Sequence, residues 1–441
     1  MASKKERKEA RKKSKAAVKR RKAEEKALLK AQTKAERRAE KKAAFSESWR
    51  ELGEVLGGYD FGVVALVVIL SLFGVAMVFS AGYYETINFS EPDPLYYLRR
   101  QLFFVATGLV LMFVFANINY RIYKYTYVIA ALVSLALLVV VMFLGTSVNQ
   151  AQRWIDLGFI RITPSEFSKV LMIMFTSGFL ASKPRGVKTI GGLGIIVLVM
   201  GLHLWLIFAQ PNLSTAIVIA AIMIAIMLVA GLNIFFMIVP VIGAIGLYFY
   251  IITSKTPLHW YKRIESFTNP FADRQGDGYQ VTQGLIALGN GGIKGLGFGR
   301  SVSKNLYLPE PQNDFILAII GEELGYIGFL VLMILYIILL FRLFMIALKA
   351  RDRLGLFLAT GVAAMLGLQV IINVAVVTAS MPATGITLPF ISYGGTSVWA
   401  FMIAMGIALN VSKRTNAMER YMRRRKDEEA AAGFEGSEAA V

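Results

Sequence analysis

The chain has 441 residues, of which 56% are hydrophobic, and its 48 lysines and arginines outnumber its 29 aspartates and glutamates. Soluble domains are about 45–50% apolar, so this composition excludes an ordinary soluble protein and indicates membrane spans. The sequence contains no cysteine, which excludes disulfides and metal sites built from thiolates.

The positive charge is concentrated in the two tails of the chain. Residues 1–50 carry 20 lysines and arginines against 7 glutamates, and seven more basic residues follow Val411. Polybasic segments of this kind bind anionic lipid headgroups, whereas an arm that binds nucleic acid carries aromatic residues between its cations. We therefore expect residues 1–58 and 413–441 to be cytoplasmic tails that contact membrane lipids and no nucleic acid.

Residues 59–412 are expected to form one membrane domain. Ten apolar stretches within it are each near the ~20 residues that a helix needs to cross a bilayer. They predict an all-α integral membrane protein with about ten transmembrane helices. The predicted spans are 61–82, 102–118, 125–145, 165–182, 190–209, 213–231, 233–252, 318–345, 355–378 and 396–412.

The distribution of basic residues predicts the orientation of these spans. An even number of spans places both termini on one side of the membrane. The positive-inside rule assigns that side to the cytoplasm, because the basic tails and the short basic connections 120–124, 183–188 and 349–353 all lie there. The longer loops, which then face outward, are 83–101, 146–164, 253–317 and 379–395.

Eleven basic residues depart from this rule because they fall in the predicted outer loops. We expect an anionic ligand at the outer leaflet to explain them as a group, although any single one could instead extend its charge to the lipid headgroups. They are Arg99, Arg100, Arg153, Arg161, Lys255, Lys262, Arg263, Arg274, Lys294, Arg300 and Lys304.

The loop at 146–164 leads into a span that begins with charged residues. Pro164 and Ser165 are residue types found at helix starts, and Glu166 and Lys169 are three residues apart, on one face of the helix. Charges at membrane depth are costly and are paired or functional in most cases. Glu166 and Lys169 are therefore either a structural ion pair or a unit in which Glu166 holds Lys169 near a bound phosphate or a catalytic carboxylate.

The loop at 253–317 is the longest polar segment outside the tails, and we expect it to hold the catalytic chemistry. Asp273 lies in a turn rich in glycine and proline, where it is either a capping residue or a general base. The residues alone favour the capping role. The glycine-rich run 289–299, with Lys294 and Arg300 beside its glycines, could cradle phosphates, but it matches no nucleotide-binding motif.

Two further polar features interrupt the last spans. Glu322 and Glu323 lie within the eighth span, where a proton relay, a cation site and a partner contact are all open interpretations. Gln369 and Asn373 share one helical face in the ninth span. The segment 379–395, rich in proline and glycine, predicts irregular backbone that lines a cavity or is buried in protein.

Five motifs follow one another along the spans: RWIDLG, PSEFSK, GDGYQVTQ, LPEPQNDFILAIIGEELGYIG and PATGITLPFISYGGTS. In wording and order they resemble the SEDS family (shape, elongation, division and sporulation), of the FtsW and RodA type, over roughly residues 60–412. The resemblance implies ten transmembrane helices and a peptidoglycan glycosyltransferase that polymerises lipid II at the outer face of the bacterial membrane. The wording PEPQNDF is closer to the division and sporulation members than to the elongation members.

The resemblance also implies roles for individual residues. It places the catalytic aspartate, as general base, on Asp273 and the membrane-entering pair on Glu166 and Lys169. The chain departs from the family pattern in two places: Arg274 stands where the family often has proline, and residues 149–154 lack the family's glycine and carry an extra residue before the Arg-Trp pair. The residues expected to bind substrate are Arg153, Glu166, Lys169, Arg274, Gln280, Lys294, Arg300, Asp314, Ser392 and Thr396.

The expected reaction is processive transglycosylation with inversion, which releases undecaprenyl pyrophosphate. Cations such as Lys169, Arg153 and Arg300 would stabilise the charge of the leaving group. The sequence requires no cofactor, although a divalent cation, Mg or Mn, could assist. Expected partners are lipid II, a class B penicillin-binding protein, other membrane proteins of the division complex and membrane lipids, at the division septum. Two alternatives stay open, a lipid II flippase and a non-catalytic scaffold for division proteins.

Overall fold

The structure is a computed structural model. It describes residues 58–87, 93–148, 151–158, 160–254, 261, 264–265, 267–268, 278–305 and 307–438. The chain divides into two compact units, Met1–Phe61 and Gly62–Val441, and the fold described below is that of the second unit. Asp273, Arg274 and almost all of the basic N-terminal tail lie outside the described residues.

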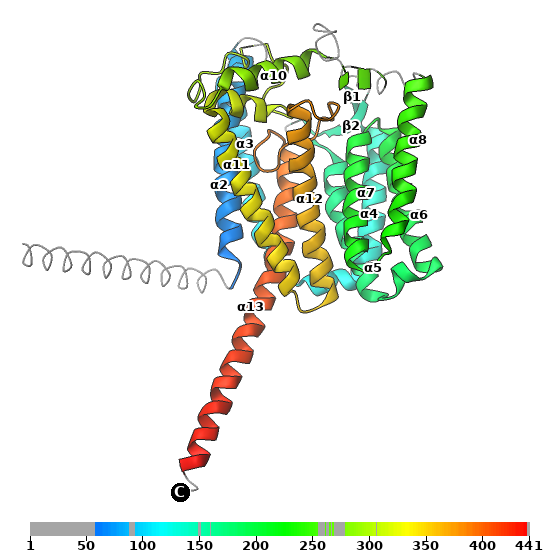
Figure 1. Cartoon of the computed structure of the whole chain (residues 1–441), viewed down its shortest axis with the longest axis vertical. Coiled ribbons are helices and arrows are strands. Elements are labelled where there is room, and N and C mark those ends of the chain that lie inside the picture. Colours follow the sequence, from blue (N-terminus) through cyan, green and yellow to red (C-terminus); the bar gives the residue numbers. More distant parts are fainter. Residues whose placement is uncertain are drawn as a thin grey trace, which may run out of the picture. The chain divides into compact units, whose positions relative to one another are not determined.

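Helices of 17 residues or more coincide with all ten predicted ranges. They lie side by side with their long axes nearly parallel (Figure 1). The short helix α10 (Tyr279–Gly291) lies at one end of this bundle, which we call the loop end. The long helices are α2 (Phe61–Glu85), α3 (Tyr96–Asn117), α4 (Tyr123–Leu144), α5 (Pro164–Ser182), α6 (Ile190–Ala209), α7 (Leu213–Val229), α8 (Ile238–Ser254), α11 (Ile316–Lys349), α12 (Arg353–Val377) and α13 (Gly395–Glu438).

Seven of the described helices are long and apolar enough to cross a membrane. The other three are α5, α7 and α8, with 19, 17 and 17 residues. Helix α5 also begins with the polar turn PSEFSK. The prediction of a multi-pass helical membrane fold is confirmed, while the count of ten spans stays a prediction. The seven are α2, α3, α4 with the turn before it, α6, α11, α12 and the first part of α13.

A small antiparallel sheet at the loop end departs from the predicted all-α architecture. Thr146 pairs with Trp154, and Ile155 pairs with Ile162, so the sheet joins the end of α4 to the start of α5. The prediction missed it because strands of two to six residues are too short to show a period in the sequence. The strands, in sheet order, are β1 (Thr146–Val148), β2 (Ala151–Asp156) and β3 (Arg161–Ile162).

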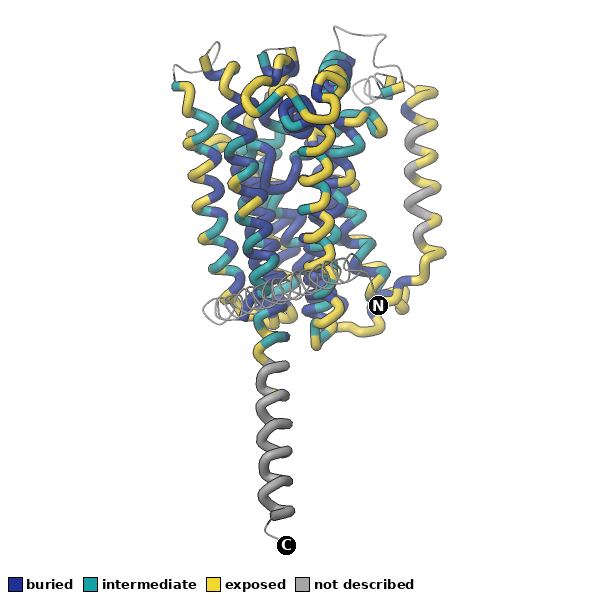
Figure 2. The backbone as a smooth tube through the Cα atoms, turned by 60° about the vertical axis from the view of Figure 1, so that its left-hand side comes forward, coloured by how far each residue is buried: buried dark blue, intermediate teal, exposed yellow. Residues whose placement is uncertain are grey.

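Helices α12 and α13 form the centre of the bundle. Helix α12 contacts α5, α7, α11 and α13, and α13 also packs closely along α3. In an apolar 18-residue stretch of each helix, 83% of the residues of α13 are buried, against 28% for α3, α4 and α6. Figure 2 shows the same division, with buried backbone in the middle of the bundle and exposed residues on its outer helices. The outer helices therefore turn apolar side chains outward, where a bilayer would cover them.

Helix α11 is broken at Gly325, whose φ of 68° and ψ of −168° leave the helical region. Beyond the break, two N–H groups have lost their helical partners. The N–H of Tyr326 instead donates to the carbonyl of Gly292 at 2.9 Å, and that of Ile327 donates to the carbonyl of Ile293 at 3.2 Å. The turn after α10 thus satisfies backbone groups that the break would otherwise leave open.

The same turn also satisfies the carbonyls on the other side of the break. Those of Glu322 and Glu323 accept from the N–H groups of Leu296 and Gly297 at 3.0 and 2.9 Å. A Cβ at Gly295 would lie 2.2 Å from the Glu323 carbonyl oxygen, so only glycine fits there. The amides of Leu296 and Gly297 are thus occupied within the chain and are not open to a phosphate. The glycine run is a backbone joint between the turn and α11.

Close packing of α13 against α3 predicts a measurable effect of one methyl group. A Cβ at Gly406 would lie 2.4 Å from the Met112 carbonyl oxygen, whereas a Cβ at Gly201 on α6 would meet nothing within 4 Å. Gly406→Ala should destabilise the protein by about 1–3 kcal/mol through overpacking. Gly201→Ala should be neutral or stabilising, because alanine favours a helix by up to about 1 kcal/mol. Thermal unfolding of both variants in one detergent checks this, and equal melting temperatures would contradict it.

Candidate active site

Lys169 is a buried cation near the start of α5. Its side chain is 3% exposed, and its ammonium lies 2.7 Å from a carboxylate oxygen of Glu166. It also donates to the side-chain oxygen of Gln369 on α12 at 3.1 Å. The ring of Phe401 on α13 has its centroid 6.0 Å away. The predicted pair is therefore formed, and it lies where α5, α12 and α13 meet.

Polar atoms near this pair lack partners. The amide nitrogen of Gln369, the amide oxygen of Asn373 and the hydroxyl of Thr384 are buried without a hydrogen-bond partner among the described residues. Gln369 and Asn373 are each 1% exposed. An unsatisfied buried polar atom costs about 1–3 kcal/mol. Of these three side chains, that of Gln369 is hydrogen-bonded directly to Lys169, so a polar ligand bound here would gain hydrogen bonds. We call Glu166, Lys169, Gln369, Asn373 and Thr384 the central polar cluster.

The turn between α6 and α7 closes one side of this cluster. Asn212 donates to the hydroxyl of Ser165 at 3.5 Å, and Ser214 donates to the carbonyl of Thr384 at 2.9 Å. Arg153 on β2 donates to the carbonyl of Gln210 at 3.1 Å and also to that of Pro211. Arg153 therefore braces this turn, and it is half-buried rather than open to the surface.

The segment between α12 and α13, residues 378–394, is held by side chains. Asn373 donates to the carbonyls of Ile386 and Asp314, both at 2.8 Å. The Ser392 hydroxyl accepts from the N–H of Leu388 at 2.7 Å. This irregular segment is thus anchored within the protein, as the sequence predicts. It brings Asp314, which precedes α11, beside the central polar cluster.

Thr396 and Gln312 tie further parts of the loop end together. The Thr396 hydroxyl donates to the carbonyl of Arg161 and accepts from the N–H of Thr163, both at 3.2 Å. Gln312, which is 2% exposed, donates to Glu85 on α2 at 2.7 Å and to the Tyr97 hydroxyl on α3 at 3.0 Å. Both residues position backbone of the loop end.

Tyr393 adds a phenol to the same region. Its N–H donates to the carbonyl of Gln312 at 2.8 Å, and its ring meets that of Tyr97 with centroids 4.9 Å apart. Burial raises the pKa of Tyr393, and the guanidinium of Arg100 opposes this shift. The hydroxyl therefore stays protonated near neutral pH and can donate a hydrogen bond.

Three other predicted substrate residues lie in a different part of the sequence from the central polar cluster, on α10 and the turn that follows it. Gln280, on α10, donates to the carbonyl of Pro309 at 3.4 Å. Lys294 and Arg300 are exposed on the turn that follows α10. The predicted base Asp273 and its neighbour Arg274 lie outside the described residues. The substrate contacts expected of all these residues stay predictions.

Lys304 corrects one expectation from the sequence, which counted it among outward cations for an anionic ligand. It is 5% exposed, and its ammonium lies 2.8 Å from Glu323, which is fully buried. Ser80 on α2 donates to the same oxygen of Glu323 at 2.7 Å. Glu322 accepts from Asn290 at 3.2 Å and from Ser301. Both glutamates are thus internal, which contradicts the interpretation of these residues as a partner contact.

Sequence reasoning noticed Gln369 and Asn373 but assigned neither to the site. The available signal was the pair itself, because two amides four residues apart in an apolar span share one face. Thr384 carries no such signal, since only the fold brings it beside them. Among the described residues, no group of three or more His, Asp or Glu side chains could hold a metal ion.

Comparison with known proteins identifies the family. The family model described as "Cell cycle protein", which covers FtsW, RodA and SpoVE proteins, matches residues 61–417. The chain belongs to this family. The resemblance read from the five motifs is therefore confirmed.

Relatives agree with this assignment over most of their length. Stage V sporulation protein E of Bacillus subtilis is 38% identical over 358 residues, which are 80% of this chain and 97% of that protein. A probable peptidoglycan glycosyltransferase FtsW of Trichlorobacter lovleyi is 38% identical over 362 residues, 81% of this chain and 94% of that protein.

Solved structures share the fold. A chain from a study of how a peptidoglycan synthase complex coordinates polymerization and crosslinking matches with a TM-score of 0.66 at 26% identity, over 81% of this chain and 98% of that one. The rod shape determining protein RodA of Thermus thermophilus matches with a TM-score of 0.59 at 27% identity, over 80% and 97%.

The buried Lys304–Glu323 pair predicts a strong effect on stability. Lys304→Met or Glu323→Gln alone should destabilise the protein by about 3–5 kcal/mol, because each leaves the other buried polar group unpaired. The double variant should lose less than the sum of the two. Lys294→Met is the matched control, since Lys294 is an exposed lysine ten residues away. Thermal unfolding measures all four, and additive losses would contradict a direct interaction.

Proposed function

We propose that this protein is a peptidoglycan glycosyltransferase that polymerises lipid II into glycan strands at the outer face of the cytoplasmic membrane during cell division. Membership of the family and relatives named as peptidoglycan glycosyltransferases support the activity. The observation that carries the proposal is the central polar cluster. It places a buried cation and three unpartnered polar atoms beneath the loop end, where an anionic, sugar-bearing lipid would be met.

The proposed reaction joins two lipid-linked sugars. The Asp273 carboxylate takes the proton of the acceptor's 4-hydroxyl while that oxygen bonds to the anomeric carbon of the donor. The bond from this carbon to the pyrophosphate oxygen breaks on the opposite side, so the configuration inverts. Undecaprenyl pyrophosphate leaves with the electron pair of the broken bond. A positioned general base of this kind contributes about 10²- to 10⁴-fold to the rate.

Lys169 is better placed than Arg153 to pair with the pyrophosphate or with the donor sugar. Its low exposure removes competing water, and a cation in such a site stabilises developing negative charge more than it does in water. Glu166 holds the ammonium, and the open amide groups of Gln369 and Asn373 supply hydrogen bonds that a polar substrate would complete. Arg153 acts indirectly, because it holds the α6–α7 turn that borders the central polar cluster.

The remaining substrate contacts are proposed from the charge of the side chains and from their positions in the sequence. Arg274 and Arg300 add cations near the base and the α10 turn. The proposed set also includes Gln280, Lys294, Asp314, Ser392 and Thr396. The reaction needs no cofactor, since the donor is already activated as a pyrophosphate, and a divalent Mg or Mn ion is an optional aid to be tested by chelation.

The proposed setting is the division septum of a bacterial cytoplasmic membrane. The basic connections support an orientation with both termini in the cytoplasm and the loop end outside. A class B penicillin-binding protein is the proposed partner, because a structural neighbour comes from a peptidoglycan synthase complex. Other division-complex membrane proteins would direct the pair to the septum.

Asp273→Ala tests the base. Polymerisation of labelled lipid II, with the cognate penicillin-binding protein present, should fall by at least about 10²-fold. Asp277→Ala, four residues on in the same turn region, should keep most of the activity. If Asp273→Ala folds, binds its partner and still makes glycan polymer, the base assignment is wrong. Lipid II translocation by that same variant would support the flippase instead.

Lys169→Met separates a catalytic cation from a structural ion pair. The single variant should lose both stability, by about 3–5 kcal/mol, and polymerisation, because Glu166 is left buried and unpaired. The double variant Glu166→Gln with Lys169→Met removes the unpaired charge and should recover the melting temperature. We expect it to remain at least about 10²-fold slower than wild type. Recovery of activity together with stability would show that the pair is only structural.

A further inference from the structure

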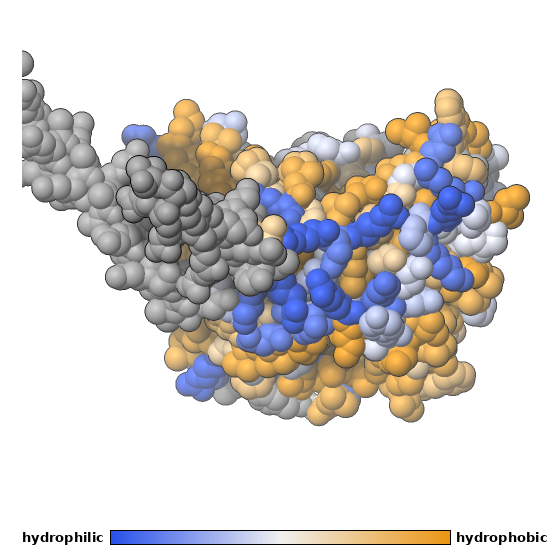
Figure 3. All heavy atoms as spheres, turned by 90° about the horizontal axis from the view of Figure 1, so that it is seen from below, coloured by the Kyte–Doolittle hydropathy of each residue, from blue (hydrophilic) through white to orange (hydrophobic). Residues whose placement is uncertain are grey.

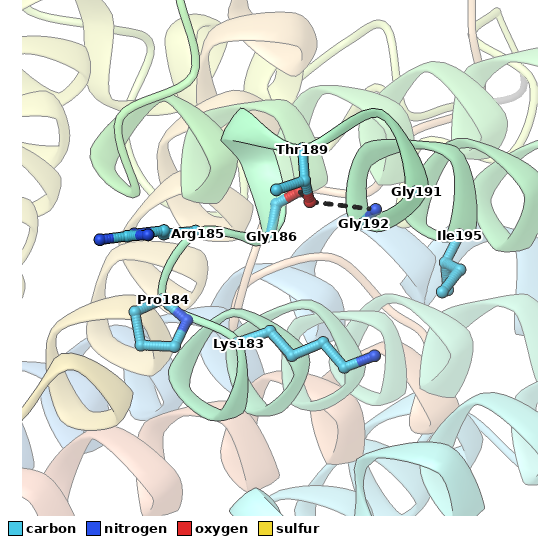
Figure 4. A pocket seen from close by; sticks show the side chains of 8 residues that line it. All are labelled: Lys183, Pro184, Arg185, Gly186, Thr189, Gly191, Gly192 and Ile195. Carbon is cyan, nitrogen blue, oxygen red and sulfur yellow. Dashed lines mark hydrogen bonds between the residues drawn. The ribbon is translucent and has the colours of Figure 1, made fainter.

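Two open pockets flank the turn between α5 and α6, residues 183–189, which lies at the end of the bundle opposite the loop end. The first has a volume of about 650 Å³, and Lys183, Thr189, Gly191 and Ile195 line it (Figure 4). The second has a volume of about 680 Å³ on the other side of Thr189, with Lys188 and Asn233 in its wall. Neither pocket shares a residue with the central polar cluster.

The turn carries a local excess of positive charge. Lys183, Arg185 and Lys188 are all exposed, and none of the three has an ion-pair partner among the described residues. Lys183 and Arg185 both line the first pocket, and Figure 4 shows their side chains extending in opposite directions, that of Lys183 toward Ile195. Lys183 and Arg185 are therefore the cations of the first pocket, and Lys188 is the cation of the second.

The start of α6 adds hydrogen-bond donors to this charge. The first N–H groups of a helix have no intrahelical partner, and its dipole favours an anion there. Thr189 uses its hydroxyl to cap Gly192 at 3.3 Å (Figure 4). Gly191 has no side chain, and a Cβ there would meet nothing within 4 Å, so the pocket is open above the helix start.

The flanks of the pockets are apolar and exposed. Ile190 is 95% exposed, and Ile195, Val197 and Leu198 are exposed by 42%, 47% and 63%. Seen from this end, hydrophilic side chains gather in the middle of the face and hydrophobic ones at its rim (Figure 3). A molecule bound at the turn would thus contact cations at one end and the exposed apolar side chains of α6 along its length.

We propose that the α5–α6 turn binds the headgroup phosphate of an anionic phospholipid in the inner leaflet. Lys183 and Lys188 pair with the phosphate, the α6 N-terminus faces it, and the exposed side chains of α6 hold the acyl chains. Basic pockets between transmembrane helices on the cytoplasmic side bind anionic lipids by this chemistry. The site depends on the proposed orientation of the spans but not on the proposed reaction.

Such a lipid would support a sparsely packed helix of the bundle. Only four of the 20 residues of α6 are buried, namely Ile196, His203, Leu206 and Ile207. Its contacts are with η3 (Gly186–Lys188), α7 and α4. A bound lipid therefore adds contacts at the N-terminal end of α6, where the helix has few.

Lipid retention by the purified full-length protein tests the charges. Native mass spectrometry would follow binding of phosphatidylglycerol and phosphatidylcholine with the same acyl chains. Wild type should prefer phosphatidylglycerol, and Lys183→Gln with Lys188→Gln should weaken its binding by at least about tenfold. The matched control, Lys349→Gln with Arg351→Gln, removes the same charge from the α11–α12 turn. An equal loss in the control would overturn the site, because only general surface charge would then be acting.

A second pair of variants tests the pocket without changing charge. Gly191→Phe fills the first pocket, and Gly201→Phe places the same ring at an open position farther along α6. The first should abolish the preference for phosphatidylglycerol, and the second should keep it. Retention of the preference by Gly191→Phe would overturn the proposal. Inorganic phosphate at millimolar concentration should not displace the lipid; displacement would show a free-anion site instead.

Discussion

A membrane interior offers no water to an open backbone group, so irregular backbone persists there only where the protein satisfies it. This chain breaks its helices at Gly325 and again in the segment 378–394. At Gly325 the turn after α10 exchanges four backbone hydrogen bonds with the broken helix. In the second segment, Asn373, Gln101 and the Ser392 hydroxyl provide the partners. Both irregular segments therefore bring polar groups among the helices, and these hydrogen bonds satisfy part of their backbone.

Two buried lysine–glutamate pairs show how a structural site differs from a binding site. Lys304 and Glu323 join α2, α11 and the turn after α10, and neighbouring serines donate to the same centre. Around Lys169, buried amide atoms on α12 lack partners among the described residues, and at the other pair one carboxylate oxygen of Glu323 likewise lacks one. Buried polar atoms without partners lower the free energy of unfolding, and a bound polar ligand would supply the missing hydrogen bonds. We propose the Lys169 pair, rather than the Lys304 pair, as part of the active region, because it lies where α5, α12 and α13 meet.

The sequence predicted the helices and the Glu166–Lys169 pair because both follow from local spacing. Apolar runs of span length and charges three residues apart need no knowledge of the fold. The role of Lys304 could not be predicted, since its partner Glu323 is 19 residues away and meets it only through the break at Gly325. The glycine run had the composition of a phosphate loop, and only the pairing of its amides showed that it is a joint.

That joint also fixes α10, which follows Asp273 along the chain. A Cβ at Gly291 would lie 2.0 Å from the Gly321 carbonyl oxygen, so α10 is packed directly on α11. Asp273 precedes Tyr279, the first residue of α10, by six residues. Six extended residues reach about 20 Å at most, which bounds the distance of Asp273, the proposed base, from this anchor.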